Sequence, residues 1–281
     1  MFNKKKCESC GENFDIALDK CPKCNIENKN QPDEFKSIVN LKIWKHLVLF
    51  GIGWIGLQTF AAIIQLIYLL AYGPFESIEA QMEFLNLPDI GMPINSISYV
   101  LVFVALCLVL WKEITKLFKS FKNWKPYVAA AACFGAMMLF NFIYPLILKT
   151  AGVEFGNNQN ESGLQEITQN YKFLSLLIFA LIGPICEEIT YRVGLFSFFK
   201  RINKWLAYGA TILVFTLIHF GFGADDLINE LINIPFYLIA AFGFTFIYDN
   251  FGFAASLTAH ITNNFISLTF AAILGYGAVL L

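Results

Sequence analysis

The sequence predicts an all-α fold: a polytopic transmembrane helical bundle of about seven helices, preceded by a small polar head. Of the 281 residues, 57% are hydrophobic and 15% are charged. Soluble domains contain roughly 45–50% apolar and about 25% charged residues. The mean hydropathy is +0.58, and apolar stretches of about 20 residues, the length of a membrane-spanning helix, recur along the chain. A soluble single-core enzyme and a disordered chain are both excluded.

Seven apolar segments have the length expected of transmembrane helices. They are residues 43–71, 96–115, 127–148, 173–199, 205–221, 229–248 and 252–279. The Asn- and Gln-rich stretch between the third and fourth segments is expected to be an ordinary outer loop. Together these segments define a membrane region at 37–281.

The loops between the segments alternate in charge. Lysines are concentrated in the head and in residues 112–125, and a further basic group follows the fourth segment, whereas 73–94 and 150–171 are acidic or polar. None of the 20 Lys and Arg residues lies beyond Lys204. Because basic loops face the cytoplasm, we expect a plasma-membrane protein with a cytoplasmic N-terminus and an external C-terminus.

Residues 1–36 form the polar head, which contains two cysteine pairs: Cys7 with Cys10, and Cys21 with Cys24. Each pair is separated by two residues, the spacing that places four thiolates around one tetrahedral zinc ion. So short a segment cannot bury a core large enough to be stable without a metal ion or cross-link. Two disulfides, or thiols without a role, are the alternatives to zinc. We therefore expect a structural zinc ribbon. Its acidic residues argue against nucleic-acid binding, so the expected role is an interaction or sensing module that a cytoplasmic partner could bind.

Ionisable residues inside apolar segments are costly and usually mark function or face the bundle interior. Those that we single out are Glu187, Glu188, Arg192, His219 and His260. His46, beside Lys45 at the start of the first segment, is expected at the membrane interface. Cys107, Cys133 and Cys186 lie in apolar runs and are expected to be small core residues.

Helix geometry sorts these polar groups. Successive residues of an α-helix turn by about 100°, so Glu188 and Arg192 share a face and can pair, while Glu187 points elsewhere. His260 and Asn264 also share a face. If the helices adjoin, Glu187, His219 and His260 can meet within the membrane.

Such a cluster contains the groups needed to hydrolyse a peptide bond. A carboxylate can act as a general base on water, and an imidazole can share that role. A second imidazole and an amide can donate hydrogen bonds to an oxyanion. Alternatively, Glu187, His219 and His260 could hold zinc with an open coordination position.

Three motifs at these residues resemble the CPBP intramembrane proteases, a family that includes the type II CAAX prenyl endopeptidases and bacterial bacteriocin-processing and self-immunity proteins. Residues 187–192 read EEITYR and match EExxxR, residues 215–219 read FTLIH and match FxxxH, and residues 260–264 read HITNN and match HxxxN. The resemblance covers about residues 125–270. It implies a helical bundle with its active site inside the membrane.

The resemblance also implies roles for individual residues. Glu187 and His219 would activate water, while His260 and Asn264 would stabilise the oxyanion. Glu188 and Arg192 are expected to form an orienting ion pair. The usual Arg-Gly is here Arg192-Val193-Gly194, one residue longer, which bears on local helix packing. The motifs leave the need for a catalytic metal open, and a metal-free mechanism is favoured.

The expected function is therefore an intramembrane endopeptidase that acts on a peptide or protein substrate within the lipid bilayer. A non-catalytic membrane scaffold or bacteriocin-immunity protein is the main alternative. A proton- or ion-coupled transporter is the third, since intramembrane Glu and His also build proton relays. The sequence shows no internal repeat to support a transporter.

Overall fold

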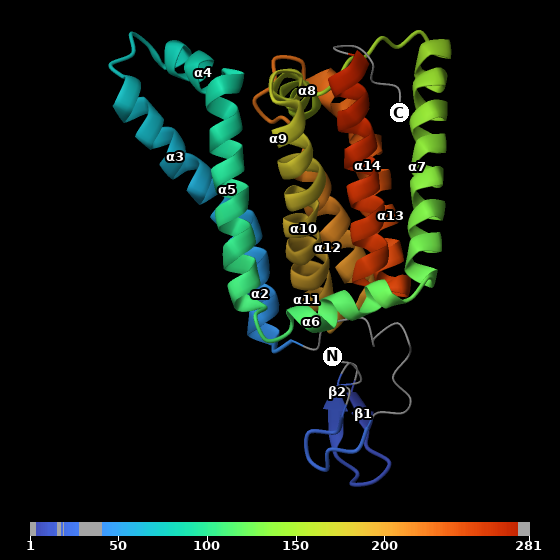
Figure 1. Ribbon diagram of the computed structural model, residues 1–281. Coiled ribbons are helices and arrows are strands. Elements are labelled where there is room, and N and C mark those ends of the chain that lie inside the picture. Colours follow the sequence, from blue (N-terminus) through green and yellow to red (C-terminus); the bar gives the residue numbers. More distant parts are fainter. Residues whose placement is uncertain (1–3, 16–17, 19, 28–40, 275–281) are drawn as a thin grey trace.

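The computed structural model describes residues 4–15, 18, 20–27 and 41–274, and it confirms an all-α, multi-pass membrane architecture (Figure 1). Five helical stretches among these residues are long and apolar enough to cross a membrane. They are Ile43–Tyr72, α5 (Pro88–Val109), α7 (Lys125–Thr150), Lys172–Lys200 and α13 (Leu227–Phe251). We call Lys172–Lys200 the central helix.

The other two predicted segments are helical but differ from the five spans. The segment predicted at 205–221 is α12 (Lys204–Leu217), which has only 14 residues and ends before His219. The segment predicted at 252–279 contains α14 (Phe253–Leu274). Polar side chains at His260 and at Asn263 and Asn264 interrupt the apolar sequence of α14. Both helices nevertheless pack against α13 inside the bundle.

The regions predicted as outer loops contain two further helices. α4 (Ile78–Asn86) begins after Ser77, whose hydroxyl accepts a hydrogen bond from the Ala80 amide, and α5 starts at Pro88. The prediction of a loop over 73–94 is therefore wrong in its extent. α8 (Gln159–Asn170) occupies most of the predicted loop 150–171. Its sequence carries a capping signal, Asn158 followed three residues later by an acidic residue.

Two of the long helices contain π-helical turns. The first consists of α2 (Ile43–Gly51), η1 (Ile52–Gly56) and α3 (Leu57–Tyr72). The central helix consists of α9 (Lys172–Leu177), η3 (Ile178–Ile182), α10 (Gly183–Glu187), η4 (Glu188–Phe196) and α11 (Ser197–Lys200). A π-turn bonds i to i+5 and so accommodates an extra residue, often at a functional site. η4 contains Val193, the additional residue of the longer motif.

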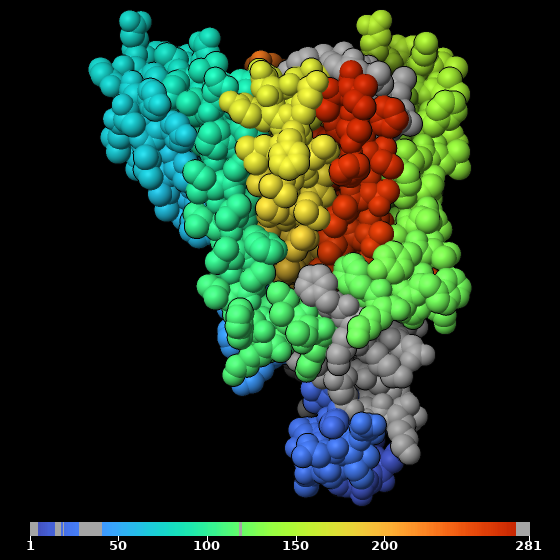
Figure 2. Space-filling model, viewed as in Figure 1, coloured from blue at the N-terminus to red at the C-terminus, as the bar shows by residue number. Residues whose placement is uncertain are grey.

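The central helix is the most enclosed of the five spans. In its most apolar window 56% of the residues are buried, against 6% in α7. It packs against α2, α5, α12 and α14, and Figure 2 shows α9 and α14 in contact along one face of the molecule. Glu187, Glu188 and Arg192 therefore lie on the best-shielded helix, whereas few residues of α7 are buried.

Glycines allow the first helix to approach the central helix closely. A Cβ at Gly53 would lie 1.7 Å from the Thr190 Oγ1 atom, and a Cβ at Gly194 would lie 3.0 Å from the Phe50 amide nitrogen. Small residues at such contacts let helix backbones pack directly, a common device in membrane bundles. The close contacts of α2 and η1 with η4 thus depend on two residues without side chains.

His46 takes part in the same contact. Only 1% of its surface is exposed. Its Nδ1 donates to the Val193 carbonyl at 2.6 Å, and its Nε2 accepts from Arg201 Nη2 at 3.3 Å. The expectation of an interfacial His46 is wrong, because a carbonyl of the central helix and the Arg201 guanidinium satisfy the ring inside the protein.

The smaller elements lie at the basic ends of the helices and in the head. α6 (Ile114–Leu117) and the 3₁₀ turn η2 (Phe118–Lys122) connect α5 to α7. In the head, β1 (Lys4–Lys6) pairs antiparallel with β2 (Asn13–Asp15). The boundary placed at residue 36 falls in 28–40, outside the described residues.

Replacing Gly53 by Ala is expected to destabilise the bundle by about 1–3 kcal/mol, as overpacking does. The new methyl group would overlap Thr190, a β-branched residue whose hydroxyl donates a hydrogen bond to the Cys186 carbonyl at 2.7 Å. Thermal unfolding in detergent measures the effect. Gly209→Ala in α12 is the matched control, because nothing lies within 4 Å of its added Cβ. Equal unfolding midpoints for the two variants would contradict the close contact.

Candidate active site

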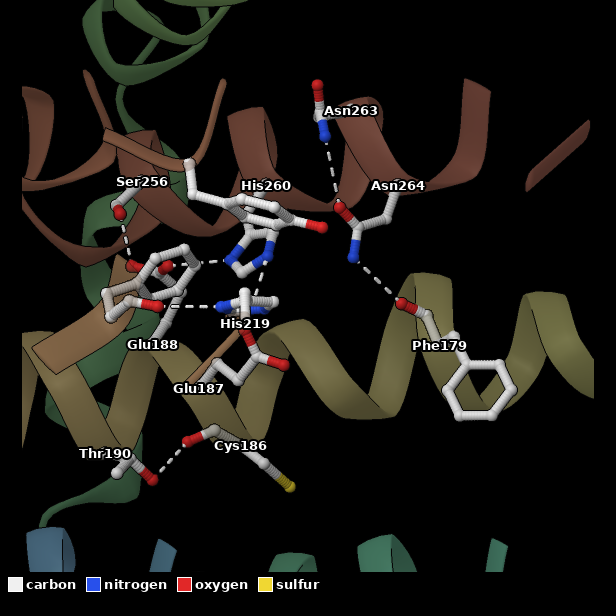
Figure 3. A network of polar contacts seen from close by, with 12 residues as sticks. Phe179, Cys186, Glu187, Glu188, Thr190, His219, Ser256, His260, Asn263 and Asn264 are labelled. Carbon is white, nitrogen blue, oxygen red and sulfur yellow. Dashed lines mark hydrogen bonds and ion pairs between the residues drawn. The ribbon is translucent and has the colours of Figure 1, made fainter. Parts of the chain in front are cut away.

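The polar residues singled out from the sequence come together where the central helix, the end of α12, and α14 meet (Figure 3). Glu187 ends α10 and Glu188 begins η4. His260 and Asn264 project from α14 toward them, and His219 lies beside the same group. The site is therefore assembled from segments about 30 to 70 residues apart in the chain.

Glu188 is fully buried and its carboxylate has three partners. Oε1 accepts from His260 Nδ1 at 2.8 Å and lies 3.3 Å from Arg192 Nη1. Oε2 accepts from the Ser256 hydroxyl. The pairing expected between Glu188 and Arg192 is present in the structure. A carboxylate bonded in this way joins two helices and leaves no lone pair facing solvent.

Arg192 is fully buried beside two aromatic faces. Its guanidinium carbon lies 4.7 Å from the centre of the Phe215 ring and 5.6 Å from that of Phe244. Cation–π attraction of this kind is strongest where water is excluded. Phe215, the aromatic of the FxxxH motif, thus supports the ion pair from α12.

Glu187 has a different environment from its neighbour. Its side chain is 16% exposed, whereas that of Glu188 is not exposed at all. The Tyr99 hydroxyl donates to Oε1 at 3.5 Å, and His260 Nε2 lies 3.6 Å from Oε2. Both contacts are long, which is common at reactive groups before substrate binds. Glu187 is the carboxylate of the pair that water can reach.

The two histidines differ in how their rings are held. His260 Nδ1 faces Glu188, and its ring stacks on Phe244 with centroids 4.5 Å apart. His219 Nδ1 donates to the Phe215 carbonyl at 2.7 Å, so in a neutral ring its Nε2 carries a lone pair. Phe215 contacts both rings, with centroid distances of 4.7 Å to His219 and 6.0 Å to His260.

Asn264 lies one helical turn beyond His260. Its Nδ2 donates to the Phe179 carbonyl at 3.0 Å, and its Oδ1 accepts from Asn263 Nδ2 at 3.2 Å. Phe179 belongs to η3. A side-chain amide has two N–H donors, so one remains for a ligand.

Several residues of this region escaped the sequence analysis. Tyr99 comes from α5, and a tyrosine in an apolar segment carries no specific signal because tyrosines are common in membrane helices near the interface. Ser256 lies four residues before His260, a spacing that places it on the same face. Glu230 and Asp249 are buried acidic residues on α13, and their positions near the ends of that helix made them resemble loop charges.

Both overlooked acids have partners. The Glu230 carboxylate accepts hydrogen bonds from the backbone amides of Gln159 and Gly221 at 2.6 and 2.8 Å. Asp249 pairs with Lys200 and Lys204, and it accepts from the Tyr208 hydroxyl at 3.0 Å. Each acid therefore connects α13 to a neighbouring segment.

In the head, the four cysteine sulfurs all lie within 4.8 Å of one another. The closest pairs are Cys7 with Cys24 at 3.6 Å and Cys10 with Cys21 at 3.5 Å. A tetrahedral site with metal–sulfur bonds of about 2.3 Å separates its sulfurs by about 3.8 Å. Backbone amides of Cys10 and Ser9 lower the pKa of Cys7 to about 6, whereas desolvation and hydrogen bonds with the neighbouring thiols raise the pKa of Cys10 to about 12. The cluster can therefore bind a metal ion, whereas among the described residues Glu187, His219 and His260 form no group this tight.

Comparisons with known proteins agree with the family resemblance of the three motifs. Residues 169–266 match the family described as type II CAAX prenyl endopeptidase Rce1-like. An uncharacterized protein of Mycoplasma capricolum subsp. capricolum is 30% identical over 140 residues, which cover 47% of this chain and 39% of that protein. No solved structure matches the chain significantly. The family match contains all six residues of the three motifs that were singled out as candidate active-site residues.

The two glutamates should differ in their effect on stability. Glu188→Ala leaves the Arg192 charge buried without its carboxylate, which is expected to cost about 3–5 kcal/mol. Glu187→Ala removes a partly exposed group with long contacts and should cost about 1 kcal/mol or less. Unfolding of both purified variants in the same detergent makes the comparison. A larger loss for Glu187→Ala would contradict the division between the two carboxylates.

Proposed function

We propose that this chain is an intramembrane endopeptidase of the CAAX-protease type, which hydrolyses a peptide bond with activated water. The observation that carries the proposal is the contrast between two adjacent glutamates, one sealed in an ion pair and one open. Adjacent acids held in different environments are typical of acid–base sites. The family match at 169–266 supports the same reaction class.

In the proposed reaction, Glu187 is the general base, with His219 beside it. The water oxygen forms a bond to the scissile carbonyl carbon, while one water proton moves to the Glu187 carboxylate. The lone pair on His219 Nε2 accepts a hydrogen bond from the same water. When the carbon–nitrogen bond breaks, the proton passes to the leaving nitrogen, and an acid and an amine are released.

Asn264 and His260 are proposed to stabilise the tetrahedral intermediate. The free N–H of Asn264 can donate to the oxyanion. Because His260 Nδ1 is directed at Glu188, its Nε2 presents a proton only when the ring carries both protons. Glu188 and Glu187 flank that ring and would balance its charge. Glu188 and Arg192 thus act through His260 by orienting it.

The distribution of charge supports a cytoplasmic N-terminus and a plasma-membrane location. Lys45, Lys200 and Lys204 lie at the helix ends grouped with α6 and α11, while α4 and α8 lie at the opposite ends (Figure 1). Basic residues mark the cytoplasmic side. Residues 1–36 would then form a cytoplasmic zinc ribbon available to a protein partner, and 37–281 the membrane bundle with its protease core at about 125–270.

Glu187→Gln is expected to reduce cleavage at least 100-fold, the usual contribution of a general base, without unfolding the protein. The probes are a quenched fluorescent peptide that ends in a farnesylated CAAX sequence and its unprenylated twin. Membrane-peptide profiles of cells with wild-type or Glu187→Gln protein search for natural substrates. Glu166→Gln, an exposed change on α8, is the control. Undiminished cleavage by Glu187→Gln would exclude the mechanism.

The head is expected to hold one zinc ion per chain. Cys21→Ser should reduce bound zinc from about one equivalent to nearly none, because structural sites need all four ligands. Metal analysis of the purified protein measures the loss. Cys107→Ser, in α5, is the control and should retain the metal. Zinc that persists in Cys21→Ser would show that the ion lies elsewhere.

A further inference from the structure

His219 lies beyond the helix that carries it. α12 ends at Leu217, so continued α-helix does not hold the segment from His219 to Gly221. The His219 and Phe220 amides still donate to the Thr216 and Leu217 carbonyls at 3.2 and 3.3 Å, and side chains from two other places in the chain bind the His219 carbonyl and the Gly221 amide. The position of the His219 ring therefore depends on residues outside the three motifs.

Asn158, the cap of α8, contacts the His219 backbone. Its Nδ2 donates to the His219 carbonyl at 3.1 Å. Its Oδ1 accepts from the Glu161 amide at 2.9 Å and from the Tyr237 hydroxyl at 3.2 Å. Only 2% of Asn158 is exposed. One buried amide thus caps α8, bonds to α13 and holds the carbonyl of His219.

Tyr237 fixes the His219 ring itself. The two rings are stacked, with centroids 4.8 Å apart and planes 22° apart. Phe215 contacts the same imidazole, and the Nδ1 bond to the Phe215 carbonyl sets its rotation. Tyr237 lies on α13 and makes its second contact with Asn158.

Glu230 anchors the end of the segment. Its carboxylate accepts from the Gly221 and Gln159 amides and is 2% exposed. A Cβ at Gly221 would lie 2.6 Å from Gln159 Oε1 and 3.1 Å from Glu230 Cδ. A side chain at residue 221 would therefore have to displace Gln159 or Glu230, the residues that bond this segment to its neighbours.

We propose that Asn158, Tyr237 and Glu230 are positioning residues that hold His219 in its working orientation. This proposal rests on the proposed function, because it gives His219 a role in activating water. Asn158 precedes the family match at 169–266, so the site would depend on a segment outside the matched region. α8 would thereby serve as a support for the site rather than as a connecting loop.

Asn158→Asp is the sharpest variant. Aspartate keeps the oxygen that caps α8 and accepts from Tyr237, but it loses the N–H that binds the His219 carbonyl and places a negative oxygen against it. We expect kcat to fall about tenfold with KM within about twofold, since a small displacement of a reacting group has such an effect. Asn203→Asp, the same change at the α12 cap, is the matched control and should leave both constants unchanged.

Hydrogen exchange supplies a readout that needs no substrate. Asn158→Asp and Glu230→Gln should accelerate amide exchange at residues 219–223, whereas Asn203→Asp should leave exchange at these residues unchanged. Tyr237→Leu should lower kcat in the same way as Asn158→Asp. Wild-type kcat in both of these variants, or unchanged exchange at 219–223, would overturn the proposal. Failure of the wild-type protein to cleave any peptide would refute the proposed function, and exchange would still decide whether these residues hold the segment.

Discussion

The bundle depends on one buried carboxylate, that of Glu188. It binds Arg192 on its own helix and both Ser256 and His260 on α14, while Phe215 and Phe244 bring α12 and α13 against the same guanidinium. Four helices therefore meet around one ion pair. An unpaired charge in a hydrocarbon environment is too costly to persist, so this arrangement strongly disfavours packings that separate these helices. A polar contact, in addition to apolar packing, therefore fixes how these four helices are aligned with one another.

Glu187 and Glu188 are adjacent in the chain but differ in their surroundings, because only Glu188 belongs to the buried ion pair. Glu188 is fully buried in its ion pair, whereas the Glu187 side chain, turned by about 100° on an α-helix, is 16% exposed. Tyr99 and His260 contact Glu187 only at long range. Glu188 thus joins neighbouring helices, Glu187 is the carboxylate that solvent reaches, and His260 contacts both.

Much of this arrangement could be predicted from the residues, and the remainder had identifiable physical reasons for escaping prediction. Apolar length locates the spans, and four-residue spacing pairs Glu188 with Arg192. The π-turns leave no periodic signal, so the fit of the longer Arg192-Val193-Gly194 sequence was not foreseeable. His46 and Tyr99 acquire their surroundings from helices distant in sequence. Glu230 lies at the edge of an apolar segment, where the sequence does not distinguish a buried acidic residue from an exposed one in a loop.

The polar face of α14 has a consequence for how the protein is made. His260, Asn263 and Asn264 reduce the hydrophobicity of a helix that must nevertheless enter the bilayer, and their partners Glu188 and Phe179 are on the central helix. The central helix is synthesised first. We therefore expect α14 to enter the membrane by packing its polar side chains against the central helix, so that its insertion is coupled to tertiary assembly. Insertion of α14 and assembly of the polar site would then be a single event in biogenesis.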